Sequence, residues 1–266
     1  MSRLSRTAVQ RDLRTRWVGR ELIYRVRTTS TMDDARDAAD RGLPDGTVIV
    51  AEEQTAGRGR KRDRRWVSPP GQNLYFTILL RPDLERARRM SIVMPVAIAN
   101  AVEQLLGVYP RIKWPNDLRL RGRKFVGILT EAEWKAGVPE YVLSAAGVNV
   151  NFDPGNHSAD IEQAATSLAL ERGRPLDREA VLSSILNAFE RAYEGALSDA
   201  LFEGWRSRSE TLGRQVTVTQ DNGRTLDGIA EDLDADGALL VRTPDGTLHP
   251  LHAGEVSVRA LPVDKP

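Results

Sequence analysis

Six arginine or lysine side chains stand within eight consecutive positions of the segment GRGRKRDRRW, residues 57–66. Positive charge at this density binds a nucleic acid, handles the phosphates of a substrate, or forms a solvated surface run. The glycines follow a predicted strand, as in a phosphate-binding turn, but the like-charge run and Pro69-Pro70-Gly71 disfavour a helix after them. The segment is therefore predicted to be a long charged loop between two strands, and neither a dinucleotide-binding fingerprint nor a Walker loop.

A second group of polar residues lies in IKWPNDLRLRGRKFVGIL, residues 112–129. Trp114-Pro115-Asn116-Asp117 is typical of a turn that leaves a strand. Lys113 stands directly before this turn, and Lys124 follows on the next hairpin arm. Gly127 interrupts a predicted strand, where a missing side chain often lets a ligand or another backbone approach. A plain structural turn and an anion-binding site both remain open.

A third candidate is SAAGVNVNF, residues 144–152, in which Gly147 and Asn149 interrupt an apolar strand. A buried asparagine needs hydrogen-bond partners. Asn149 therefore either ties down a neighbouring loop or bonds a ligand such as a nucleobase.

Other catalytic arrangements are missing from the sequence. The three histidines, His157, His249 and His252, have no carboxylate spacing that resembles a zinc site, and no Ser-His-Asp set can be assembled. The chain contains no cysteine, which excludes structural disulfides and thiolate chemistry and fits a reducing cytoplasm.

The overall charge is nearly balanced. Among 266 residues, 38 are basic and 37 acidic, for a formal net charge of +1, so any attraction for an anion must be local. No stretch approaches the roughly 18 apolar residues of a membrane span, and the N-terminus lacks a signal-peptide pattern. We expect a cytoplasmic protein with no membrane partner.

The elements that must position these residues indicate an α+β fold with a mixed, largely antiparallel sheet flanked by helices. Ser30 and Thr31 are candidate N-caps of a helix that ends at Gly42, and apolar spacing predicts further helices over 90–107 and 176–207. Strands are predicted over 47–54, 73–80, 111–114, 118–120, 124–134 and 141–150. Five short β runs separated by glycine-containing turns follow, over 215–220, 226–233, 238–243, 247–252 and 255–260.

These patterns divide the chain into a short lead-in (1–20), a main domain (21–209) and a small β-barrel (210–262). The lead-in is too short to hold a folded DNA-binding module ahead of the main domain.

Taken in order, TSTM, AEEQTAGRGRKRDRRWVSPPGQNLYFTILLRP, KWPND, GRKFVGIL and GVNVN resemble the motifs of the biotin protein ligases. The resemblance is specific over about residues 24–152 and continues more loosely to the end of the chain. It implies a class II synthetase-like catalytic domain followed by an SH3-like barrel.

The resemblance implies a two-step reaction. Biotin and MgATP form biotinyl-5′-adenylate, and a specific lysine of a biotin carboxyl carrier domain then takes the biotinyl group. The acceptor would be the carrier of a carboxylase acting on acetyl-CoA or pyruvate. A lipoate or octanoyl ligase is the enzymatic alternative, and a nucleic-acid-binding protein is the alternative of another class.

The resemblance also assigns residues. The catalytic residues would be Lys124, Asp117 and Arg58. The biotin site would be formed by Ser30, Thr31, Met32, Gln54, Arg58, Gly59, Arg60, Lys124 and Gly127. The nucleotide site would be formed by Arg60, Arg64, Trp66, Lys113, Asn116 and Asn149.

Three departures from the family pattern are visible. Met32 stands where the best-known members have asparagine, and the basic loop is one residue longer, so Arg64 is aligned from Trp66. An adenine-stacking tryptophan has no counterpart near AATSL, residues 164–168. Bifunctional members carry a winged helix-turn-helix ahead of the catalytic domain, and the lead-in of this chain is too short to hold one. We therefore expect a monofunctional ligase without specific DNA binding. We also expect a dimer or a monomer–dimer equilibrium.

Overall fold

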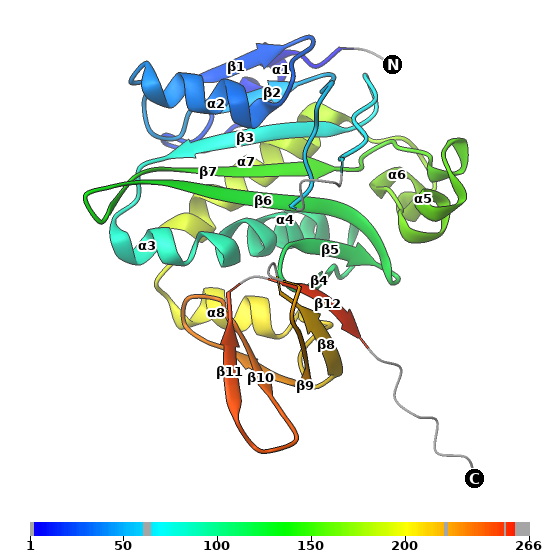
Figure 1. Ribbon diagram of the computed structural model, residues 1–266. Coiled ribbons are helices and arrows are strands. Elements are labelled where there is room, and N and C mark those ends of the chain that lie inside the picture. Colours follow the sequence, from blue (N-terminus) through cyan, green and yellow to red (C-terminus); the bar gives the residue numbers. More distant parts are fainter. Residues whose placement is uncertain (1–2, 61–64, 221–222, 253, 259–266) are drawn as a thin grey trace.

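A seven-stranded sheet forms the centre of the protein, as the computed structural model shows for residues 3–60, 65–220, 223–252 and 254–258 (Figure 1). Its strand order is β1-β2-β3-β7-β6-β5-β4. Only β1 and β2 pair in parallel, and all other neighbours are antiparallel, which confirms the predicted fold class. The strands are β1 (Leu22–Arg25), β2 (Val48–Ala51), β3 (Leu74–Leu80), β4 (Arg111–Lys113), β5 (Asp117–Leu120), β6 (Arg123–Lys135) and β7 (Val138–Val148).

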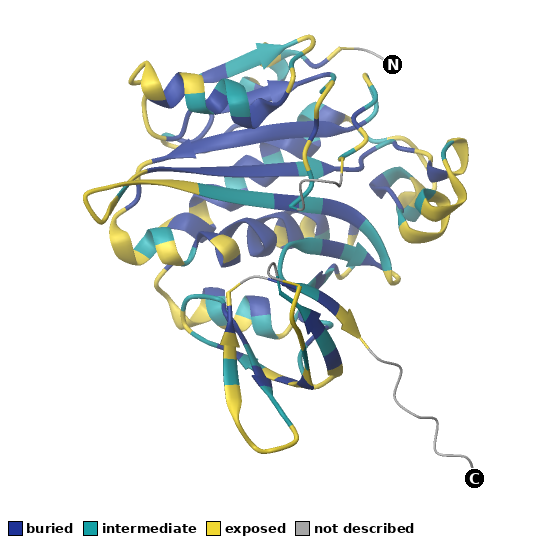
Figure 2. Ribbon diagram, in the orientation of Figure 1, coloured by how far each residue is buried: buried dark blue, intermediate teal, exposed yellow. Residues whose placement is uncertain are grey.

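The interior strand β3, LYFTILL, is buried along its whole length because helices cover both faces of the sheet (Figure 2). Phe76 and Ile78 face one hydrophobic cluster, whereas Leu79 belongs to the other. This alternation follows from the two-residue period of a strand. A continuous apolar run is what a strand covered on both sides requires.

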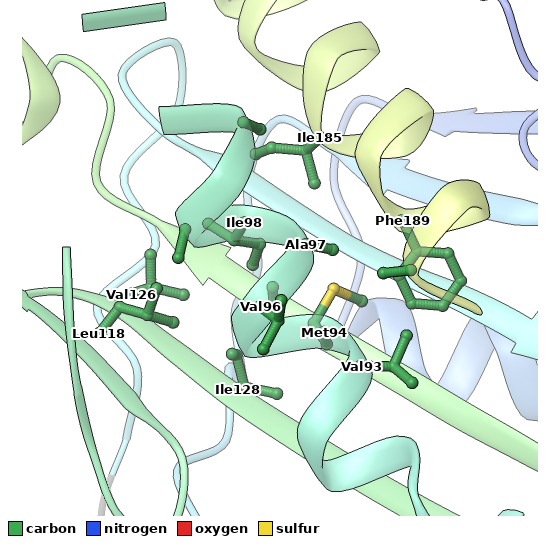
Figure 3. Close-up of a cluster of buried hydrophobic side chains, with 14 of the residues drawn as sticks. Val93, Met94, Val96, Ala97, Ile98, Leu118, Val126, Ile128, Ile185 and Phe189 are labelled. Carbon is green, nitrogen blue, oxygen red and sulfur yellow. The ribbon is translucent and has the colours of Figure 1, made fainter. Parts of the chain in front are cut away.

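The larger cluster packs α4 (Met90–Leu106) and α7 (Arg178–Glu194) against one face of the sheet (Figure 3). Val93 and Met94 of α4 lie toward Phe189 of α7, and Val126 and Ile128 of β6 lie on the other side of α4. The smaller cluster packs α2 (Thr31–Asp40) on the opposite face through its alanines. Ser30 caps α2 as predicted, since its hydroxyl accepts from the Met32 amide at 3.3 Å.

The predicted helix over 176–207 is two helices. α7 ends at Gly195, and α8 (Asp199–Arg206) begins after Ser198, whose hydroxyl accepts from the Leu201 amide. The apolar spacing continues through the break, but this serine cap starts a new helix. Further short elements are α3 (Leu84–Arg88), the 3₁₀ turn η1 (Pro154–Asn156), α5 (Ala159–Ala164) and α6 (Leu168–Arg172).

The N-terminal segment packs into the main core. It forms α1 (Arg6–Asp12), and Leu4, Val9, Leu13 and Val18 are buried in the cluster that contains α4 and α7. These residues therefore add to the core that supports the sheet.

The C-terminal residues form a five-stranded antiparallel sheet in the order β11-β10-β9-β8-β12. The strands are β8 (Gln215–Thr219), β9 (Thr225–Leu233), β10 (Leu239–Arg242), β11 (Leu248–Leu251) and β12 (Glu255–Val258). Four fall within a predicted β run, and β9 begins one residue before its run. Val216, Leu239 and Val256 belong to the same hydrophobic cluster as α4, so the two sheets share one core. Within the described ranges, none of the helices has the length and apolar character to cross a membrane.

Phe189→Ala should lower the free energy of unfolding by about 3–5 kcal/mol, because a fully buried aromatic ring would leave a cavity between α4 and α7. Denaturant titration followed by fluorescence measures the loss. The control Leu170→Ala removes a side chain that is 48% exposed and should change the value by less than about 0.5 kcal/mol. Equal stability of the two variants would contradict this packing.

Candidate functional site

A pocket opens above β6 and β7, where the N-terminus of α2, the chain after β2 and the basic loop converge. The chain on either side of residues 61–64 descends across the sheet toward β6 (Figure 1). The lining residues come from four parts of the sequence: Ser30, Thr31, Met32, Gln54, Arg58, Gly59, Arg60, Trp66, Asn116, Lys124, Gly127–Leu129 and Ala145–Gly147.

One end of this first pocket carries neutral donors and acceptors. The Gln54 side-chain oxygen accepts from the Thr31 amide at 2.9 Å, and its Nε2 donates to Ser68 Oγ at 3.2 Å. Thr77 Oγ1 on β3 donates to Thr31 Oγ1 at 2.8 Å. These bonds hold the polar side chains of α2 and the post-β2 chain in fixed positions, as a preformed site for an uncharged polar group requires.

Two glycines form the floor of the pocket. Gly127 on β6 and Gly147 on β7 are register partners, and the indole of Trp66 lies against both. A Cβ at Gly147 would stand 2.4 Å from Trp66 Nε1, and one at Gly127 would stand 2.8 Å from its Cζ3. Only glycine at both positions therefore admits a flat group this close to the sheet.

The basic loop is attached on two sides. Arg58 forms an ion pair with Asp33 of α2, and Arg60 donates to the carbonyl of Gly254, before β12, at 2.7 Å. The Trp66 amide donates to the Gly57 carbonyl at 3.0 Å and closes the base of the loop. Arg64, the third predicted arginine, lies outside the described residues.

A cluster of charges stands at the other end of the first pocket. Lys124 Nζ lies 2.6 Å from Asp117 Oδ1 and 5.3 Å from the Trp66 ring. Lys113 is the cross-strand partner of Asp117, so a second lysine stands on the strand next to this carboxylate. Asn116 holds the intervening turn against β6, since its Nδ2 donates to the Ile128 carbonyl at 2.7 Å.

Burial lowers the pKa of the Lys113 ammonium, and the neighbouring Arg119 guanidinium lowers it further. Asp117, Glu210 and Glu255 act in the opposite direction. An added phosphate would favour the charged form of this lysine, so the cluster is suited to an anion.

A second pocket, about 370 Å³ in volume, adjoins this cluster. Lys124 lines both pockets, whereas Lys113 and Asp117 line the second pocket. One wall comes from the segment around α5, with Phe152, Ile161, Ala164 and Ala165, and another from Gly254–Val256 of the C-terminal domain. This volume falls in the usual range for small-molecule sites.

Asn149 ties two loops together. Its Nδ2 donates to the Thr166 carbonyl at 3.1 Å, and its Oδ1 accepts from Asn73 Nδ2 at 3.3 Å. The structure therefore supports the loop-tying interpretation of this asparagine, although the residue also lines the second pocket.

The structure brings the predicted residues together. All nine residues of the proposed biotin set line the first pocket. Five of the six in the proposed nucleotide set line the second: Arg60, Trp66, Lys113, Asn116 and Asn149.

Sequence reasoning missed part of the lining. Gly147 carried a signal, a glycine inside an apolar strand, but was not assigned to a site. Phe152 and Ala145 have none, because apolar residues in such segments are ordinary core residues. Gly254–Val256 meets the basic loop only through folding.

Comparison with known proteins places this geometry in a family. Residues 22–149 match the Biotin/lipoate A/B protein ligase family, and residues 211–259 match the Biotin protein ligase C terminal domain.

Individual relatives agree with these matches. The Bifunctional ligase/repressor BirA of Bacillus subtilis is 34% identical over 92% of this chain and 76% of its own length. The Biotin--[acetyl-CoA-carboxylase] ligase of Paracoccus denitrificans is 35% identical over 83% of this chain and 94% of its own. The structure of biotin protein ligase from Aquifex aeolicus in complex with biotin and ATP superposes with a TM-score of 0.72, at 26% identity, over 90% of this chain and 99% of that one.

Gly147→Ala should displace the Trp66 indole, because the added methyl group would overlap it. Nitrogen-15 labelling of the five tryptophans reports this directly: the indole resonance of Trp66 should shift while the other four stay in place. Gly195→Ala is the control, since its Cβ would meet nothing closer than 3.5 Å. An unchanged Trp66 resonance in folded Gly147→Ala would contradict the close approach.

Proposed function

The chain belongs to the biotin protein ligase family, and we propose that it forms biotinyl-5′-adenylate from biotin and ATP and transfers the biotinyl group to a lysine of a carrier protein. The observation that carries the proposal is the arrangement along one slot: a neutral polar end, a glycine floor, and a cationic end that opens into a second pocket. Biotin has the matching sequence of groups, a ureido ring, an apolar body and a carboxylate.

In the first step a carboxylate oxygen attacks the α-phosphorus of ATP, and the bond from that phosphorus to the bridging oxygen of pyrophosphate breaks. Two anions must approach, so fixed positive charges are needed where charge gathers on the phosphoryl oxygens. Lys124, which lines both pockets, and Lys113, which lines the second, supply such charges, and Arg58 and Arg60 supply them from the basic loop. Arg64 is proposed to join them.

In the second step the amine of the carrier lysine attacks the acyl carbon, and the bond to the phosphate oxygen breaks to release AMP. The amine reacts only when it is neutral. Asp117 is the carboxylate placed to accept its proton or orient it, and the ion pair with Lys124 keeps Asp117 beside the cationic end of the slot.

The magnesium ion of MgATP would be held mainly by phosphate oxygens, as is usual for this ion. Asp117 and Glu255 line the second pocket and are suitable oxygen ligands. No group of three metal-binding side chains occurs in the part of the chain that the structure describes, which fits an ion delivered with its nucleotide.

The basic run is proposed to serve a small anion and not a nucleic acid. Arg58 and Arg60 line the first pocket, with attachments to α2 and to the chain before β12. The chain as a whole has a net charge of only +1. A lipoate ligase is less well supported, because a dithiolane ring could not use the hydrogen-bonding set around Thr31 and Gln54.

Purified protein should exchange labelled pyrophosphate into ATP only when biotin is present. Lipoate should give the background rate, since the polar end of the slot would be left without partners. Exchange that proceeds equally with lipoate, or without either acid, would contradict the proposal.

Lys124→Ala should lower the rate of biotin-dependent exchange by about 10²–10³-fold, the usual cost of removing one fixed charge from the reacting centre. Lys135→Ala is the control, because this lysine is exposed near the distal end of β6. Wild-type exchange by Lys124→Ala would remove Lys124 from the mechanism.

Asp117→Asn should slow biotin transfer from preformed adenylate to a carrier domain by about 10²-fold or more, and slow pyrophosphate exchange by less. Single-turnover transfer and exchange are measured on the same preparation. If both rates fall equally, Asp117 acts through Lys124 and not on the amine.

A further inference from the structure

A buried ion pair lies outside both pockets. Glu52 follows β2 directly, two residues before Gln54, and Arg178 is the first residue of α7. Both side chains are only 4% exposed, and the guanidinium meets both carboxylate oxygens, at 2.9 and 3.2 Å. Neither residue lines either of the two pockets described above, and neither belongs to the proposed catalytic set.

The pair holds the segment through which the basic loop returns to β3. The Gly71 amide donates to Glu52 Oε2 at 3.2 Å, and Arg178 Nη1 donates to the Asn73 carbonyl at 3.1 Å. We call residues 66–73 the return arm, because they run from Trp66 to the start of β3. The Leu4 amide also donates to Glu52, which attaches the N-terminal segment at the same point.

A continuous path of hydrogen bonds leads from the pair to the strand that carries Lys124. Asn73 donates to Asn149 Oδ1 at 3.3 Å, and Asn149 donates to the Thr166 carbonyl at 3.1 Å. The Thr166 amide then donates to the Lys124 carbonyl at 2.9 Å. Each link joins a different segment, so the path fixes the return arm relative to β6.

Stability alone is a weak reason for such a pair, since well-packed apolar residues often serve as well in its place. Burial by itself would raise the pKa of the Glu52 carboxyl, but the Arg178 guanidinium and the Leu4 and Gly71 amides hold it below its ordinary value. The carboxylate is therefore charged at neutral pH and fully committed to these donors.

We propose that Glu52 and Arg178 are positioning residues for biotin binding and adenylate formation. They hold the return arm so that Trp66 covers the glycine floor, and they set Lys124 through Asn73, Asn149 and Thr166. Displacement of reacting groups by about 1 Å can cost about 10²-fold in rate, so a loosened arm should be visible in the kinetics. The kinetic form of this inference rests on the proposed function.

The chain offers a matched control in Glu190 of α7. Its carboxylate is also buried, and it accepts from three backbone amides, those of Arg16, Trp17 and Val18, at 2.6–3.0 Å. These donors belong to the N-terminal segment and not to the return arm. Loss of Glu190 should therefore cost stability without moving the pocket.

The test compares Glu52→Gln, Arg178→Met and Glu190→Gln with wild type, all well below their melting temperatures. We expect the first two to raise the KM for biotin in pyrophosphate exchange by about tenfold or more. Glu190→Gln should lower the melting temperature and stay within about twofold of the wild-type KM. Arg178→Lys, which keeps the charge, should have a KM for biotin between those of Arg178→Met and wild type.

Hydrogen exchange provides a readout that needs no activity. The amides of the return arm should exchange faster in Glu52→Gln, whereas those of residues 16–18 should do so in Glu190→Gln. Unchanged hydrogen exchange of the return-arm amides in Glu52→Gln would overturn the proposal. A KM for biotin that rises in proportion to the loss of melting temperature in all variants, Glu190→Gln included, would overturn it too. If the wild-type protein shows no biotin-dependent ATP–pyrophosphate exchange, only the proposed function is contradicted. The hydrogen-exchange comparison then still decides whether Glu52 and Arg178 position the return arm.

Discussion

The antiparallel pairing of β6 with β7 places Gly127 directly opposite Gly147, and the slot depends on that register. A shift of one residue would turn the two strands' core side chains outward and set a side chain where the indole now lies. Helices on both faces fix the register, because each strand must present apolar residues to the clusters above and below. The same packing that stabilises the sheet therefore also leaves a strip of backbone without side chains, against which the Trp66 indole lies.

Arginines of the basic loop and lysines of β4 and β6 bring several positive charges close to the glycine floor, where they repel one another. The repulsion is reduced locally: Asp33 pairs with Arg58, Asp117 pairs with Lys124, and the Gly254 carbonyl accepts a hydrogen bond from Arg60. The two carboxylates are partly exposed, so an anion in solution can compete for the same cations. The polar set at Thr31 and Gln54 has no such charge, which separates the two ends of the slot chemically.

The sequence allowed most of the sheet, the main helices and the polar residues of the first pocket to be predicted, because each carried a local signal. Runs rich in β-forming residues marked most strands, glycine-containing turns separated the C-terminal ones, and ordered motifs marked the slot. β1 was not predicted, because its four residues between loops are too few to show a periodic pattern. The break after α7 depended on a single serine cap, and the Glu52–Arg178 pair joins positions 126 residues apart. Contacts of that kind arise only from folding.

The shared core has a consequence for anyone who would divide this protein. Trp205, Val216, Leu239 and Val256 pack in one cluster with α4, and Trp114 Nε1 donates to the Gly237 carbonyl at 3.1 Å. A fragment cut near residue 210 would expose apolar surface on both halves and lose the wall of the second pocket formed by Gly254–Val256. The C-terminal sheet therefore cannot serve as an exchangeable module, and fusion partners belong at the chain ends and not at the boundary between the two sheets.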